Sequence, residues 1–345
     1  MRVLNAAVVA GEVLMGADFV GDCFADDHPA PREVCCRSGA HPGCFDSYFT
    51  AQRCCVPDAG LAAFRQRAES VNIVIDECLA EKPASCSSLC NSMVVSEDCR
   101  EFCDVGLAGA GPSEPHAVNG ASVLGRVTYC LARSQLVRSA LDLFGGTGGS
   151  AALIAHALRQ SAPPGQPAPL VTFEMSEDVR ALLMEALKVF DPISVPVDHG
   201  ENQRQLSNAV SGTGLRVVVL AGEAYPLYEC GNTHCHVGKY SLEPSQLENL
   251  CGIAPMDLVF LDAPFPASRE WLVVDKFCKP RFVVVYGSSL PSGPGWIREQ
   301  LLSWPHWAEL RTGILADPHA SGPGHEIGRV RKWSVLMRDF AADYH

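Results

Sequence analysis

The stretch that decides the fold is Ser139–Phe144 (SALDLF), followed directly by Gly145–Gly149 (GGTGG) and then by Ser150–Leu158 (SAALIAHAL). The first segment is a short apolar run of the kind that forms a buried parallel strand. The last segment has the composition of a helix, and the glycines between them permit a tight turn and a close approach of the backbone to a ligand. This order of strand, Gly-rich turn and helix predicts the opening unit of a doubly wound α/β sheet.

A second strand with an acid at its tip follows. Leu170–Phe173 (LVTF) predicts this strand, which ends at Glu174, and Ser176 is a suitable N-cap for a helix that reaches Val189. The separation of Glu174 from the Gly turn suits one βαβ unit. A carboxylate in this place is suited to hydrogen bonds with two ribose hydroxyls.

The remaining segments predict the rest of the sheet. A helix is expected near Ala121–Ser134 and another from Gly295. Further strands are expected over Leu215–Leu220, Met256–Asp262 and Arg281–Tyr286, and an antiparallel hairpin over 307–313 and 328–338. We therefore predict an α/β fold with a seven-stranded, doubly wound, mostly parallel sheet.

The residue at position 142 distinguishes between two classes of cofactor. Gly146, Gly148 and Ala151 fit a loose dinucleotide fingerprint, so a nicotinamide oxidoreductase is one interpretation. Dinucleotide folds keep the position of Asp142 apolar, since the pyrophosphate is anionic. A carboxylate there suits a cofactor that carries an ammonium group.

The segment Asp142–Gly148 (DLFGGTG) resembles the first motif of class I S-adenosylmethionine-dependent methyltransferases. Phe144 stands where the commonest form of that motif has its first glycine, a variant also found in the superfamily. The order of strands from Val137 to Phe340 is most similar to the O-methyltransferase-like branch, which acts on small molecules.

The resemblance implies a role for each residue of the motifs. The glycines of the turn would lie behind the methionine part of S-adenosylmethionine: Gly145, Gly146 and Gly148. Asp142 would lie towards its amino group, Glu174 would bind the ribose, and Met175 would pack on the adenine. Glu223, after the third strand, would face the adenine amine, and the alternative for it is a solvated acid at a strand end.

Asp262 would lie beside the methyl acceptor, as a base or as a metal ligand, with a solvated acid again as the alternative. The second and third acids of a metal-dependent catechol-type site are missing, so a divalent metal has no support from the sequence. Asp262–Phe265 (DAPF) also resembles the Asp-Pro-Pro-Tyr loop of enzymes that methylate amino groups of nucleic acids. However, Ala263 replaces the first proline, and the net charge of −12 without a dense Lys/Arg run argues against a nucleic-acid partner.

The cysteines divide the chain. Eleven of the 16 cysteines lie between Cys23 and Cys103, a density typical of disulfide scaffolds. We predict a small disulfide-stapled N-terminal module, divided into a Cys-rich loop module at 1–57 and a helical hairpin at 58–105. A linker at 106–120 and a methyltransferase-like domain at 121–345 follow. A helix with apolar residues at helical spacing is expected over Leu61–Leu79.

The hairpin prediction depends on two Cys-x3-Cys pairs. Cys86 and Cys90 share one helix face, as do Cys99 and Cys103, so two antiparallel helices would pair Cys86 with Cys103 and Cys90 with Cys99. The pattern looks like the twin Cys-x3-Cys hairpins of small oxidised organelle proteins. A different disulfide pairing and a zinc site are the alternatives.

Two further segments have competing interpretations. Val3–Val20 is apolar, but charged residues interrupt it and it is too short to span a bilayer. We expect a partly buried first helix there, with a trimmed signal peptide as the alternative. Cys230–His236 holds four soft ligands in an insertion, where a Cys230–Cys235 bridge or a polar loop is favoured over zinc.

Two functions follow from these patterns. The first is methyl transfer from S-adenosylmethionine to a small-molecule acceptor. The second is a catalytically silent accessory subunit that docks into a larger protein assembly, such as an organellar one, through the Cys-rich arm, because a fold alone does not give activity. The cysteine density favours an oxidising secretory or organelle lumen, with the cytoplasm as the alternative.

Overall fold

The computed structural model describes residues 58–80, 122–197 apart from 144 and 147, 203–222, 244–261, 267–287, 294–316 apart from 305, and 330–339. It also describes the backbone of four short strands, at 7–9, 12–14, 228–230 and 235–237. The remainder of the 1–57 module, both predicted Cys-x3-Cys pairs and the 106–120 linker lie outside these residues.

An eight-stranded sheet forms the body, with its strands in the order β11-β12-β10-β9-β3-β4-β6-β5. The strands are β3 (Ala140–Asp142), β4 (Pro167–Phe173), β5 (Ile193–Pro196), β6 (Gly214–Ala221), β9 (Leu258–Leu261), β10 (Phe282–Tyr286), β11 (Trp307–Ala316) and β12 (Val330–Arg338). Neighbouring strands are parallel except that β12 runs antiparallel to both β10 and β11. The doubly wound, mostly parallel sheet and its closing hairpin are confirmed, but the predicted strand count of seven is wrong.

The additional strand is β5, which pairs in parallel with the outer side of β6, with Ile193 opposite Val218. Its sequence gives little sign of a strand, because only Val195 is buried and Pro196 ends it. Proline is tolerated here because an edge strand is hydrogen-bonded on one side alone.

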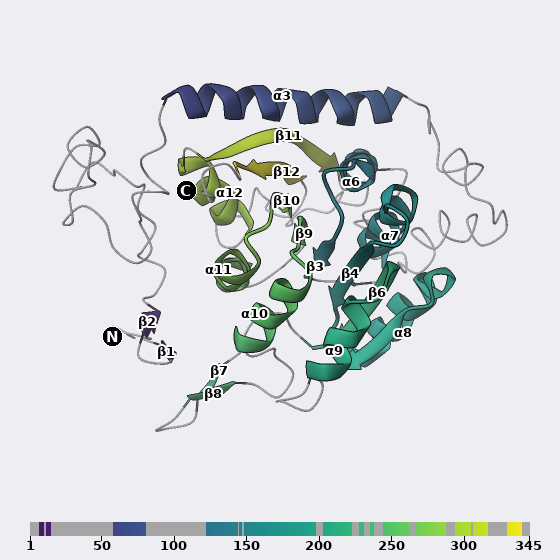
Figure 1. Ribbon diagram of the computed structural model, residues 1–345. Helices are drawn as coiled ribbons and strands as arrows, with labels where there is room; N and C mark the ends of the chain where they lie inside the picture. The colour runs from purple at the N-terminus through teal and green to yellow at the C-terminus, as the bar shows by residue number, and fades with distance from the viewer. Residues whose placement is uncertain are drawn as a thin grey trace, which may run out of the picture.

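Helices cover both faces of the sheet (Figure 1). One face packs on α3 (Asp58–Ala80), α6 (Val123–Arg133), α7 (Gly149–Ser161) and α8 (Glu177–Ala186), with the short 3-10 turn η1 (Lys188–Phe190) after α8. The other packs on α9 (Gln203–Val210), α10 (Pro244–Ile253), α11 (Ala267–Cys278) and α12 (Pro294–Ser303). Strand residues alternate between these two cores, as the period of two requires: Ala140 belongs to the first and Leu141 to the second.

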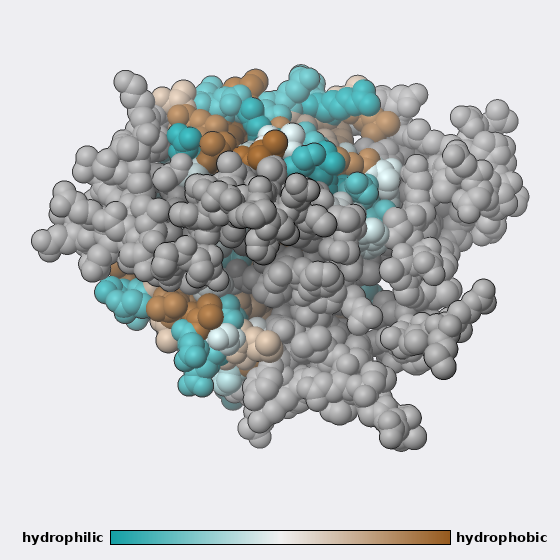
Figure 2. Space-filling view, turned by 180° about the vertical axis from the view of Figure 1, so that it is seen from behind, coloured by the Kyte–Doolittle hydropathy of each residue, from teal (hydrophilic) through white to brown (hydrophobic). Residues whose placement is uncertain are grey.

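The predicted helix over Leu61–Leu79 is confirmed as α3, which lies along β11 and α6 (Figure 1). Its buried residues Phe64, Val71 and Ile75 belong to the same core as the sheet. The outer side, at the top of the molecule seen from behind, carries hydrophilic and hydrophobic side chains next to each other (Figure 2). The domain division at 58–105 and 121–345 stays a prediction, but α3 shares the hydrophobic core of the sheet.

Ion pairs and a disulfide also bind α3 to the body. The guanidinium of Arg67 lies 2.6 Å from the carboxylate of Asp339, which follows β12. Near the C-terminal end of the helix, Arg311 of β11 lies 2.5 Å from Asp76. The four cysteines whose side chains are described form two bridges, Cys78–Cys130 between α3 and α6 and Cys251–Cys278 between α10 and α11.

The backbone of the short strands corrects one expectation and leaves another open. β1 (Ala7–Val9) pairs antiparallel with β2 (Glu12–Leu14), so the first helix expected over Val3–Val20 is wrong. The segment is rich in valine, which favours strands over helices. In the insertion, β7 (Tyr228–Cys230) pairs with β8 (Cys235–Val237), with Cys230 opposite Cys235, and a bridge between them stays a prediction. None of the described helices combines the length and the apolar character that a membrane crossing requires.

Candidate cofactor site

The strand order alone indicates where a ligand site is expected. From β3 the sheet extends to one side through β4 and β6 and to the other side through β9 and β10. The chain leaves β3 towards α7 on one face and leaves β9 towards α11 on the opposite face. In open α/β sheets, ligands bind outside the carboxyl ends of the strands at such a switch point. The Gly turn follows β3, and position 262 follows β9.

Two glycines of the turn are required for packing. The amide of Gly145 donates a 2.9 Å hydrogen bond to the carbonyl of Phe173, which joins the turn to β4. A Cβ on Gly145 would lie 2.5 Å from Oγ1 of Thr172. Gly148 is the N-cap of α7 at φ 96°, and a Cβ there would lie 2.7 Å from Cβ of Ala186 in α8. Larger residues at these two positions would therefore push α8 away from the turn.

Gly146 is different from its neighbours in the turn. Its φ of 48° is in the left-handed region, which favours glycine. A Cβ built on it meets no heavy atom within 4 Å among the described residues. Packing against the described residues therefore does not require a glycine at position 146. The space beside its Cα lies at the switch point.

Asp142 is fully buried at the carboxyl end of β3, opposite Thr172 of β4 and Phe260 of β9. Its Oδ2 accepts a 2.8 Å hydrogen bond from the hydroxyl of Ser150 in the first turn of α7. The carboxylate is thus directed into the start of α7. Sequence reasoning missed Ser150, although a hydroxyl residue in the first turn of the helix after the Gly turn was a usable signal.

Glu174 lies on the same side of the sheet as Asp142. Residues in register on adjacent strands point to one face, and so do alternate residues of a strand. Asp142 is in register with Thr172, and Glu174 lies two residues beyond Thr172, where its own amide donates to Leu220 and continues the ladder. The structure therefore places the two predicted acids on one face.

The Glu174 carboxylate is half-buried and contacts the Gly turn. Oε1 accepts a 2.8 Å hydrogen bond from the amide of Ser176, and the backbone amides of Gly146 and Met175 lie close enough to the carboxylate to lower its pKa. Burial raises the pKa of Glu174, an effect partly offset by these backbone amides and by the charge of Arg180. An acceptor held by backbone donors beside the turn is preorganised for polar groups of a ligand.

Met175 and the start of α8 complete the described part of the site. Met175 is 51% exposed, so its thioether is available to pack against a ligand. Arg180 of α8 donates to the carbonyls of Glu174 and Met175 at 3.3 and 3.4 Å. Ser176 caps α8 by accepting from the amide of Val179, as predicted.

Glu223 and Asp262 lie outside the described residues, so their roles stay predictions. β9 ends at Leu261, and Phe260 is in register with Asp142, which puts position 262 just past the carboxyl end of the strand next to β3. β6 ends at Ala221, two positions before 223. Among the residues that the structure describes, no three His, Cys, Asp or Glu side chains gather into a metal site.

Neither a known protein family nor a curated protein matches the chain in sequence. Similar solved structures include the O-methyltransferase TomG of Streptomyces achromogenes in complex with SAM, at 15% identity and a TM-score of 0.42, over 73% of this chain and 95% of that one. An O-methyltransferase of Bacillus cereus in complex with SAH matches at 13% identity and a TM-score of 0.39, over 73% and 96% of the two chains. SAH-bound methyltransferase PaMTH1 of Podospora anserina matches at 14% and 0.38, over 73% and 93%.

All three of these proteins are methyltransferases with SAM or SAH bound. At such low identities and TM-scores they decide nothing about this chain. The fold and the location of the site rest on the strand order and on the side chains around the Gly turn.

Proposed function

We propose that the chain binds S-adenosylmethionine at the switch point between β3 and β9 and transfers its methyl group to a small-molecule acceptor. The observation that carries the proposal is the contact between Glu174 and the Gly146 amide, on the same side of the sheet as Asp142. It brings the acid that would bind a ribose against the glycine that leaves room for a ligand.

The residues present fit this cofactor at three points. Gly146 offers backbone with open space beside it, Glu174 offers a fixed carboxylate to the ribose hydroxyls, and Met175 offers an exposed apolar surface to the adenine. Asp142 would act over a longer range than a direct contact, because it is buried and bonded to Ser150. In its ionised form it would favour a cationic ligand in this region of low dielectric.

S-adenosylmethionine supplies a methyl group that its sulfonium already activates. The protein then has to align the acceptor, exclude water and take up a proton from it. In the proposal, Asp262 takes that proton, because position 262 follows the strand beside β3. The loop after β9 would line the acceptor side of the site.

Titration calorimetry with S-adenosylmethionine tests the proposal, with NAD as the comparison ligand. Glu174→Ala should weaken binding about tenfold, the value expected for lost charge-assisted hydrogen bonds. Glu177→Ala is the matched control, since Glu177 is an exposed acid in the first turn of α8. Failure of the wild-type chain to bind S-adenosylmethionine would contradict the proposal. Binding without turnover on a panel of hydroxylated and carboxylated acceptors would favour the accessory role.

We also propose that the chain works in an oxidising compartment. Two disulfides within the sheet body support this, in addition to the cysteine density of the N-terminal module. Mass spectrometry of protein from its native source, with and without reductant, tests the proposal. Free thiols at all four of these cysteines would contradict it.

A further inference from the structure

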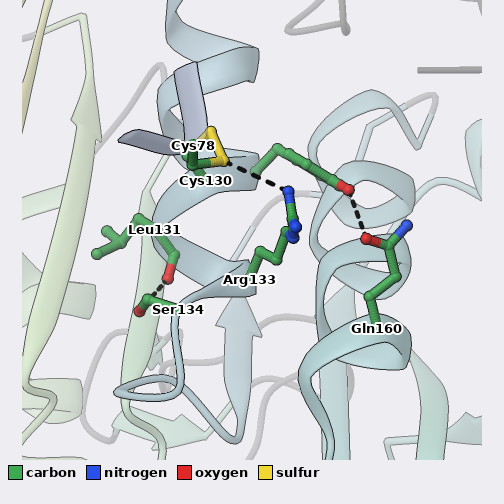
Figure 3. Close-up of a disulfide and its surroundings, with 7 residues drawn as sticks. Cys78, Cys130, Leu131, Arg133, Ser134 and Gln160 are labelled. Atoms are coloured by element: carbon green, nitrogen blue, oxygen red, sulfur yellow. Dashed lines mark hydrogen bonds between the residues drawn. A yellow bond between two sulfur atoms is a disulfide. The ribbon is translucent and has the colours of Figure 1, made fainter. Parts of the chain in front are cut away.

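A cationic side chain lies against one of the two disulfides. Cys78 is in the last turn of α3, and Cys130 lies three residues before the end of α6 at Arg133. The guanidinium of Arg133, one turn after Cys130, donates to Sγ of Cys78 at 4.0 Å (Figure 3). Within the same chain, the described contacts of the Cys251–Cys278 bridge include no such donor. Among the described contacts, a cationic side chain donates a hydrogen bond to the Cys78–Cys130 bridge alone.

A guanidinium at this distance favours the anionic form of the sulfur that a thiol exchange releases. The thiolate is the form of cysteine that leaves and attacks in disulfide exchange, and a neighbouring Arg stabilises it. Arg is suited to the task because it stays protonated at every physiological pH. Both cysteines are buried, at 8% exposure for Cys78 and 2% for Cys130, so a reductant reaches Sγ of Cys130 only when the end of α3 opens.

We propose that Cys78–Cys130 is a thiol-exchange site that a dithiol reductant opens before Cys251–Cys278. A thiolate of the reductant attacks Sγ of Cys130, a new S–S bond forms, and the Cys78–Cys130 bond breaks with its electron pair on Cys78 beside Arg133. The second thiolate of the reductant then attacks its own mixed disulfide and releases Cys130, which takes up a proton. The dithiol is oxidised to a disulfide, and the two protein sulfurs are reduced.

Access to the bridge comes from the end of α3. Cys78 lies two residues before the end of the helix at Ala80, and terminal turns open locally far more readily than a core. Cys251 and Cys278 also lie in the last turns of their helices, so the predicted order of opening rests on the Arg133 contact. Opening the bridge removes the covalent tie between α3 and α6. The ion pairs of α3 with Asp339 and Arg311 and its buried side chains remain. The exchange thus changes how α3 is attached without requiring the sheet to unfold.

Timed alkylation with peptide mass spectrometry tests this on the intact oxidised chain, with dithiothreitol as the dithiol. Cys78 and Cys130 should be labelled before Cys251 and Cys278. Arg133→Met should slow labelling of the first pair about fivefold, as a poorer leaving group predicts, without affecting the second. Arg133→Lys should keep most of the wild-type rate.

Three results would overturn the proposal. They are simultaneous opening of the two bridges, earlier opening of Cys251–Cys278, and an unchanged rate in Arg133→Met. Equal slowing in Arg133→Met and Arg133→Lys would also count against it, because packing rather than charge would then explain the rate. Circular dichroism of both variants before reduction shows whether they are folded.

Discussion

The carboxylate of Glu174, at the carboxyl end of β4, lies against the backbone amide of Gly146 in the turn after β3, and this amide lowers the pKa of the carboxyl group. The contact joins two segments that lie far apart in sequence, at the point where the connections of the sheet diverge. It also holds a half-buried acid whose pKa burial raises. Both the ligand proposal and the first prediction depend on this relationship.

The raised pKa of Glu174 predicts a pH-dependent contribution to stability. Above its ordinary value of 4.5, the unfolded chain releases this proton while the folded chain still holds it. The contribution is therefore complete below about pH 4.5 and is lost as the pH rises through the folded pKa. Glu174→Gln should reduce the fall in the free energy of unfolding between about pH 4 and pH 7, measured by urea denaturation. Glu177→Gln should follow the wild type, and the same fall in Glu174→Gln as in the wild type would refute the assignment.

The bond between Ser150 and Asp142 predicts a specific cost of removing the hydroxyl. Ser150→Ala leaves Oδ2 of a fully buried carboxylate without that donor. The free energy of unfolding should fall by about 1–3 kcal/mol. Ser70→Ala, which removes an exposed hydroxyl bonded to its own helix, should change stability by less than about 0.5 kcal/mol. If the two variants were equally stable, the Ser150 bond would not support Asp142.

The sequence predicted the central strands well because both of their faces are buried. Runs such as Leu215–Leu220 and Arg281–Tyr286 are continuously apolar, and few other structures accommodate that pattern. β5 was missed because it is an edge strand with a single buried residue, Val195, and so lacks the pattern. Asp142 and Glu174 lie on one face because the period of strands is two.

The sequence did not predict which residues far apart in the chain contact each other. Neither Cys78–Cys130 nor Cys251–Cys278 was predicted, because connectivity follows from packing and not from spacing. The same holds for the position of α3. Its apolar stripe predicts that one side of the helix is buried, but it does not predict which elements bury it. Nor does the sequence show that the Asp142 carboxylate points towards α7 and bonds to Ser150.

The Cys78–Cys130 bridge predicts a measurable loss when both sulfurs are removed. The two cysteines are separated by 52 positions, and chain-entropy arguments assign about 4 kcal/mol to closing a loop of that length. The Cys78→Ser, Cys130→Ser double variant should unfold at correspondingly lower urea concentration. Single serine variants should lose a similar amount, since either one abolishes the bridge. An unchanged midpoint would show that α3 is held by its other contacts alone.

A buried ion pair predicts a strong dependence on both partners. Arg338 of β12 lies 3.1 Å from Asp275 of α11, with the two side chains only 1% and 4% exposed. Asp275→Leu alone should cost about 3–5 kcal/mol because the guanidinium remains buried without that carboxylate. The double variant Asp275→Leu, Arg338→Met should recover most of the loss. A double variant as unstable as the single one would contradict this assignment.

We propose that Gly146 lies against bound S-adenosylmethionine. A comparison of Gly146→Ala with Gly165→Ala measures this. Both glycines have positive φ, and no heavy atom of the described residues lies within 4 Å of a Cβ built on either of them. Gly165, however, precedes β4 and so lies at the amino end of that strand. Each alanine should cost about 1 kcal/mol of stability. Calorimetry should show S-adenosylmethionine binding at least about tenfold weaker in Gly146→Ala and unchanged in Gly165→Ala. Equal affinity in the two variants would contradict the account.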